Sequence, residues 1–153
     1  MRPWGVTAFN DLSIRDPHFG LGVAVDHGPM TWSLQKNFDT SNACGPWVVV
    51  DEGLDAAALG FAMRINGELR QSGNTSEMVY SFDDVVDHIS AYVSMRSGDV
   101  IVSGTCAGTA LEQGVGGPYL QDGDELVVEV EGVGALRNRV VMAHEGARRE
   151  RSE

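Results

Sequence analysis

The sequence predicts an α+β domain dominated by β-strands, and three observations support that class. Short runs of apolar and β-branched residues recur along the 153-residue chain. Glycine, proline and polar residues separate these runs, as expected for strands joined by turns. A single segment shows clear helical spacing of its apolar residues. Many short strands with one good helix indicate one β-rich domain with one main helix.

The composition limits the kind of partner. With 42% hydrophobic residues, the chain is apolar enough to bury a core and is the size of one domain. Asp and Glu number 22 against 11 Lys and Arg, which gives a net charge of −11. Because such a surface repels phosphate backbones and anionic headgroups, we expect neither nucleic acid nor membrane as a partner.

Cellular location is inferred from what the sequence lacks. It has no apolar run of signal-peptide length near the start and nothing close to a membrane-spanning stretch. Its two cysteines, Cys44 and Cys106, cannot form a disulfide framework and are expected to be core or loop residues in a reducing compartment. We therefore expect a cytoplasmic protein.

The first half of the chain is predicted to be mainly extended. A short strand over 4–9 runs into the polar segment FNDLSIRD at 9–16, and the breakers in 17–32 indicate a long loop. WVVV at 47–50 is typical of a buried strand. Asn66-Gly67, between two short extended segments, is the strongest hairpin signal.

The second half begins with the predicted helix. Val85, Val86, Ile89, Tyr92 and Val93 recur at helical spacing, so the helix should bury one face. Its start is marked by a capping box formed by the residues at 81 and 84.

Three further strands are expected after the helix. VIVSG at 100–104 is predicted to be a short strand that ends in the glycine-rich run SGTCAGT, and DELVVEVEG and ALRNRVVM are predicted strands. The core is expected to span 1–143, and the polar tail 144–153 is expected to be disordered.

The segment FNDLSIRD is a candidate metal site. Mg²⁺ prefers carboxylate oxygens, and Asp11 or Asp16 could supply one. The alternative is that these acids cap a turn and pair locally with Arg15. Composition does not decide between the two interpretations.

Six segments in order resemble the fumarylacetoacetate hydrolase family from about Gly5 to Val140. These are ND-S-RD, a lysine ahead of a phenylalanine with a GPW strand, the hairpin NGE-Q-GNT-M, a helix, the loop GD-SGT, and the strand EVEG-G leading to L-N-V. The resemblance implies a layered β-sheet roll with few helices. It also implies Mg²⁺ or Mn²⁺ and a 2-oxo or β-diketo acid substrate, which members hydrolyse at a C–C bond, decarboxylate, isomerise or hydrate through a metal-stabilised enolate.

The resemblance also assigns site residues. Asp11 would be a metal ligand, and Lys36 would stabilise the oxyanion of the substrate, although a lysine can equally be a solvated surface residue. Thr105 would hold the substrate carboxylate, where the alternative is a plain strand-ending turn. His18 stands where many members have a substrate-contacting glutamine, and the alternative is an exposed loop histidine.

One departure from the family pattern limits the prediction of a complete metal site in this chain. Members carry a Glu-x-Glu metal-binding pair, a lid histidine and a lid glutamate well upstream of ND-S-RD, and this chain has no corresponding segment before Asp11. The later pair Glu129 and Glu131 is expected to face solvent at a strand edge. We therefore expect an N-terminally incomplete roll that is inactive alone. It is either shortened by a misplaced start codon or complemented by a separate chain that carries the Glu-x-Glu strand, and a homodimer is the other expected assembly. One alternative is a non-catalytic remnant that serves in binding or assembly, and another is a β-rich domain whose likeness to the family is structural only.

Overall fold

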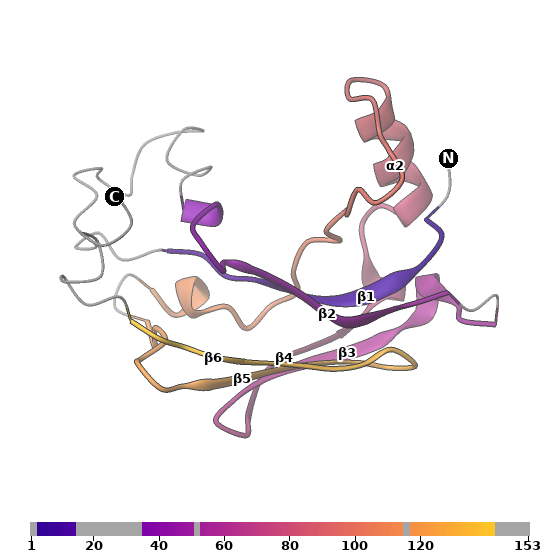
Figure 1. Ribbon diagram of the computed structural model, residues 1–153. Coiled ribbons are helices and arrows are strands. Elements are labelled where there is room, and N and C mark those ends of the chain that lie inside the picture. The colour runs from indigo at the N-terminus through magenta and orange to yellow at the C-terminus, as the bar shows by residue number, and fades with distance from the viewer. Residues whose placement is uncertain (1–2, 15–34, 51–52, 115–116, 143–153) are drawn as a thin grey trace.

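The computed structural model describes residues 3–14, 35–50, 53–114 and 117–142, and strands dominate these ranges (Figure 1). The strands are β1 Val6–Asp11, β2 Asn42–Val49, β3 Gly60–Ile65, β4 Glu68–Asn74, β5 Glu125–Val130 and β6 Gly134–Arg139. The helix α2 spans Phe82–Ser90, and 3-10 helices cover Ala56–Ala58, Thr75–Glu77 and Ala110–Gln113. The predicted β-dominated α+β class is confirmed.

The larger sheet is antiparallel, with the strand order β4-β3-β5-β6. Its first two strands form the predicted hairpin, in which Asn66 and Gly67 have φ angles of 51° and 83°. Two successive positive φ angles are the signature of the turn that matches the twist of paired strands, and Asn-Gly adopts it at low cost. Glu129 and Glu131 are exposed as predicted, but Glu129 lies on β5, inside the sheet rather than at its edge.

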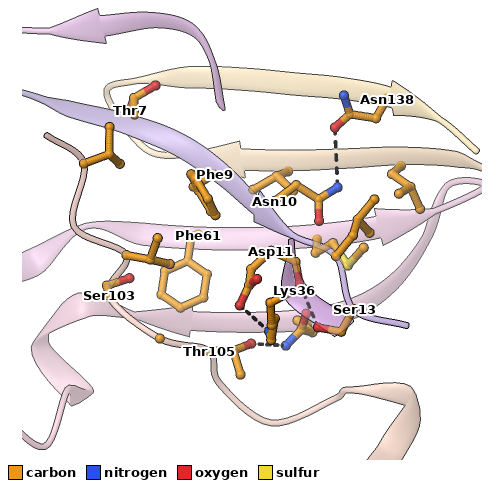
Figure 2. A pocket seen from close by; sticks show the side chains of 18 of the residues that line it. Thr7, Phe9, Asn10, Asp11, Ser13, Lys36, Phe61, Ser103, Thr105 and Asn138 are labelled. Atoms are coloured by element: carbon orange, nitrogen blue, oxygen red, sulfur yellow. Dashed lines mark hydrogen bonds and ion pairs between the residues drawn. The ribbon is translucent and has the colours of Figure 1, made fainter. Parts of the chain in front are cut away.

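A second, two-stranded sheet of β1 and β2 forms a layer over the larger sheet (Figure 1). Asn10 Nδ2 of β1 donates to Asn138 Oδ1 of β6 at 3.4 Å, and Trp47 Nε1 of β2 donates to the Val133 carbonyl at 2.6 Å. Ala8 and Leu126 are fully buried between the layers. This packing holds the end of β1, where Asp11 lies, against the larger sheet (Figure 2).

Helix α2 begins as the sequence predicts. Ser81 and Asp84 form the capping box, and the Ser81 hydroxyl and backbone N–H hold the pKa of the Asp84 carboxyl below its ordinary value. The helix stands apart from both sheets in Figure 1. It buries Val86 but ends at Ser90, so Tyr92 and Val93 lie beyond it and are exposed, contrary to the predicted buried face.

Further expectations need correction or lie outside the described ranges. Residues 100–104 form no strand, because no neighbouring strand in the described ranges pairs with them. The stretch 47–50 is not a buried strand, since β2 ends at Val49 and Trp47, Val48 and Val50 are 59%, 48% and 59% exposed. The last strand ends at Arg139, and Cys44 is exposed on β2 rather than in the core or a loop. The loop 17–32 and the tail 144–153 lie outside the described residues. Across the described ranges, no helix combines the length and apolar character needed to span a bilayer.

Candidate active site

A wide cleft opens between the two sheets and the segment that follows α2. It has a volume of about 2550 Å³ and is lined by side chains of β1, β3, β4, β5 and β6 and by residues 95–105. Small-molecule pockets typically measure about 300–1,000 Å³, so this cleft exceeds the space that a small acid needs. The predicted residues Asp11, Lys36 and Thr105 all line it.

Asp11 and Lys36 form an ion pair in this cleft (Figure 2). Lys36 Nζ lies 2.5 Å from Asp11 Oδ2, and the two side chains are 21% and 37% exposed. The lysine backbone is held by Ser41 Oγ and Asn42 Nδ2, which donate to its carbonyl at 3.0 and 3.2 Å. Asp11 therefore has a cationic partner 25 positions further along the chain, whereas Arg15, the proposed local partner, lies outside the described residues.

Thr105 lies on the turn that follows residues 100–104. Gly104 precedes it with a φ of 89°, a conformation that glycine adopts without strain. Gln71 Nε2, from β4, donates to Thr105 Oγ1 at 2.9 Å and to the Cys106 carbonyl at 2.9 Å. Figure 2 shows Asp11, Lys36 and Thr105 gathered close to one another beside the ring of Phe61.

The far end of the same turn is fixed by Glu112. Its carboxylate accepts the Gly108 backbone N–H at 2.8 Å and the Thr109 hydroxyl at 3.1 Å. The Gly108 hydrogen bond, helped by that from Thr109, holds the pKa of the Glu112 carboxyl below its ordinary value. The turn that carries Thr105 is thus tied down at both ends, by Gln71 and by Glu112.

The structure brings together three of the four predicted site residues. His18, with Arg15 and Asp16, lies outside the described residues. Gln71 was missed as a site residue, although it belongs to the NGE-Q-GNT segment, because that segment was interpreted only as a hairpin. No local sequence signal identifies it, because its partners Thr105 and Cys106 lie 34 and 35 positions further along the chain.

A divalent cation does not fit the described residues alone. Among them, no group of three or more His, Cys, Asp or Glu side chains lies close enough to hold a metal ion. Asp11 offers one carboxylate, and the Lys36 ammonium already pairs with it. Magnesium usually needs further oxygen ligands, so a complete site requires groups from elsewhere.

The comparisons with known proteins identify the family. The family model described as "Fumarylacetoacetate (FAA) hydrolase C-terminal" matches residues 4–141. The chain belongs to the fumarylacetoacetate hydrolase family. The order of motifs that suggested this resemblance, and the layered sheets of the fold, are thereby confirmed.

Relatives in this family carry names from several reaction types. The mitochondrial oxaloacetate tautomerase of Homo sapiens is 35% identical over 90% of this chain, which covers 42% of that protein. The 5-carboxymethyl-2-hydroxymuconate delta-isomerase of Mycobacterium smegmatis is 32% identical, with a TM-score of 0.75 over 93% of this chain and 49% of the other. The 2-hydroxyhepta-2,4-diene-1,7-dioate isomerase of Mycobacterium marinum is 34% identical, with a TM-score of 0.72 over 90% and 48%.

The match covers most of this chain but only part of each relative. The chain spans about half the length of the relatives it matches, including 48% of an uncharacterised protein of Archaeoglobus fulgidus that is 34% identical. The fold of the matched part is therefore shared, whereas the activity of a whole family enzyme is a matter for proposal.

Proposed function

We propose that this chain forms the substrate-binding part of an enzyme that acts on 2-oxo or β-diketo acids through an enolate. Relatives named as an oxaloacetate tautomerase and as isomerases of unsaturated hydroxy diacids support this class. Tautomerisation of oxaloacetate requires the removal of a proton from the carbon beside a carbonyl group. That step places negative charge on the carbonyl oxygen, and an enzyme accelerates it by stabilising that oxygen.

The observation that carries the proposal is the placement of Lys36 and Thr105 in one cleft. The Lys36 ammonium is held by Asp11 and is only 21% exposed, so it is a fixed positive charge beside the developing enolate oxygen. The Thr105 hydroxyl and the glycine-flanked turn bind the substrate carboxylate. The carboxylate and the reacting oxygen of a 2-oxo acid are adjacent, which suits two binding groups from neighbouring segments.

A divalent cation is a further part of the proposal. Asp11 contributes one ligand to Mg²⁺ or Mn²⁺ when carboxylates from outside the described residues join it. When bound, the cation supplies Lewis acidity for the 2-oxo group. Without those carboxylates we expect the chain to bind the cation weakly and to be inactive, since one carboxylate paired with an ammonium is a poor site.

A protein partner also belongs to the proposal. Residues 100–104 carry the strand-like sequence VIVSG, yet no backbone hydrogen bond joins them to a strand in the described part of the chain. Val100 and Val102 are 57% and 40% exposed. A segment with apolar side chains whose backbone groups are not paired in a sheet is a candidate for strand addition. We therefore propose that a further strand, from a second copy or from a complementing polypeptide with a Glu-x-Glu pair, docks there.

The decisive experiment combines binding and turnover. Mn²⁺ is titrated into the purified chain and into Asp11→Asn, and binding is followed by electron paramagnetic resonance. Oxaloacetate and an acylpyruvate are then assayed for enolisation, decarboxylation and C–C cleavage, with and without a family segment that carries Glu-x-Glu. Asp11-dependent binding and turnover with that segment support the proposal, and their absence in both conditions favours a non-catalytic assembly role.

A further inference from the structure

Gln71 projects from β4 toward the turn that carries Thr105, and its side-chain amide uses both hydrogens there. Nε2 donates to Thr105 Oγ1 at 2.9 Å and to the Cys106 carbonyl oxygen at 2.9 Å. One amide group thus fixes a side-chain oxygen and the neighbouring backbone oxygen of the same turn. This double contact lies in the cleft that holds Lys36 and Asp11.

The contact with Gln71 decides which way the Thr105 hydroxyl hydrogen points. A threonine hydroxyl has one hydrogen to donate and two lone pairs that accept. Because Gln71 donates to one lone pair, the hydroxyl must direct its own hydrogen elsewhere. The Cys106 carbonyl is 3.4 Å away, which is long for an O–H···O hydrogen bond. The Thr105 hydrogen is therefore available to an anion in the cleft.

The turn is packed so closely on β4 that Gln71 has little freedom to leave. A Cβ on Gly108 would lie 2.1 Å from the Arg70 carbonyl oxygen and 3.2 Å from Gln71 Cγ. A Cβ on Gly73 would lie 3.4 Å from the Cβ of Cys106. Glycines thus allow the turn to approach β4 on both sides of Gln71.

We propose that Gln71 is a positioning residue that presents the Thr105 hydroxyl as a hydrogen-bond donor to the carboxylate of the substrate. The inference rests on the proposed function, since it names the group that prepares Thr105 for an anion. The side-chain amide supplies both donors, and no other neutral side chain of this length supplies a planar NH₂ group.

The test exchanges Gln71 for a group of the same shape and opposite hydrogen-bond character. In Gln71→Glu the carboxylate accepts the Thr105 hydrogen and repels both the Cys106 carbonyl and the substrate. Under the conditions that support turnover of oxaloacetate, we expect KM to rise about tenfold or more while kcat stays within about threefold. In a Thr105→Val background the same exchange should change KM much less, because the two groups act as a unit.

Ser72→Glu is the matched control, because it adds the same charge one residue further along β4 at an exposed position outside the cleft. Its KM should equal that of the wild type. An unchanged KM in Gln71→Glu, or an equal rise in Ser72→Glu, overturns the inference and leaves the proposed function intact.

A second measurement separates the two proposals. If the wild type neither binds nor converts a 2-oxo acid in any condition, the proposed function fails. The role of Gln71 is then tested by nuclear magnetic resonance, in which side-chain couplings report the χ1 rotamers of Thr105. Positioning by Gln71 is supported if Thr105 has a single rotamer in the wild type and in Ser72→Glu but several averaged rotamers in Gln71→Leu. Averaging already in the wild type, or one rotamer in all three proteins, overturns it.

Discussion

At the scale of single residues, the Asp11–Lys36 pair is the feature on which the proposed chemistry depends. A buried or half-buried charge that loses its partner is costly, so each member of the pair constrains the other. The Lys36 side chain is 21% exposed and its ammonium pairs with Asp11, which limits the freedom of the ammonium. This pre-set position distinguishes it from a solvated surface lysine.

Lys36→Met should remove most of the activity. The methionine keeps the apolar stem but supplies no charge for the enolate oxygen, and loss of one such group typically lowers kcat about 10²–10³-fold. Steady-state kinetics with oxaloacetate, in the active assembly, measure the effect. Arg64→Met is the control, since Arg64 pairs with Glu129 on the larger sheet. A kcat within about twofold of the wild type in Lys36→Met would remove Lys36 from the chemistry.

The sequence predicted Asp11, Lys36 and Thr105 because each belongs to a short motif with a fixed place in the motif order. It did not predict Gln71, because a glutamine in a strand has no local signal that separates a solvated side chain from a ligand of another segment. The partner of Gln71 is 34 positions away, and that contact depends on how the turn packs on β4. Likewise, the pairing of Asp11 with Lys36 depends on the path of the chain between them.

At the scale of elements, the turn 104–109 is the part of the site whose geometry is most constrained. Gly108 has a φ of 106°, and a Cβ there would lie 2.1 Å from the Arg70 carbonyl oxygen. A contact under 3 Å with backbone cannot be relieved by a side-chain rotation. The turn therefore keeps its distance to β4 only with glycine at this position.

Gly108→Ala should lower the free energy of unfolding by more than the cost of placing an alanine at a positive φ. Positive φ alone costs an alanine about 1 kcal/mol, and the contact with β4 should add a similar amount or more. Gly98→Ala is the control, because Gly98 has a φ of 99° with open space around it. Urea unfolding of the two variants measures the difference, and equal midpoints would show that the turn is not held against β4.

The Glu112 carboxylate predicts a pH dependence of the same turn. Its pKa is held below the ordinary value by the Gly108 N–H, so the stabilisation is complete above about pH 4.5 and is lost as the pH falls through the lowered folded-state pKa. The melting temperature of the wild type should therefore fall faster in this acidic range than that of Glu112→Gln. Melting temperatures that fall in parallel for the two proteins as the pH is lowered below the ordinary pKa of 4.5 would contradict this expectation.

The elements themselves were predictable where the signal was local. Asn66-Gly67 sets its own turn, and the capping box at Ser81 sets the start of α2. The segment 100–104 was predicted to be a strand and is not one, because β-propensity describes a residue whereas a strand needs a neighbour. The apolar spacing also carried the predicted helix to Val93, but the chain leaves the helix after Ser90.

At the scale of the whole molecule, the described residues expose apolar surface that a stable domain usually covers. Val100, Val102 and the two residues beyond α2, Tyr92 and Val93, are all at least 40% exposed. The cleft beside them is larger than a small acid requires. Strand addition at 100–104 would bury Val100 and Val102 and would also satisfy the backbone groups of that segment. One contact would therefore account for the exposed valines and for the unpaired backbone.

Val102→Lys should therefore weaken association, whether with a second copy or with a complementing family segment. A lysine places a charge on the docking edge, and charged residues on strand edges are how proteins prevent such pairing. Leu69→Lys is the control, because Leu69 is 50% exposed on β4 but lies outside the cleft.

Light scattering gives the mass of each variant, and hydrogen exchange gives the protection of the 100–103 amides. We expect the wild type to associate with protected amides, Val102→Lys to lose both properties, and Leu69→Lys to keep them. A wild-type chain that remains a folded monomer with fast-exchanging amides, even with the complementing segment present, would show that this edge needs no partner. The exposed valines would then need another explanation, since the strand-addition proposal would have failed.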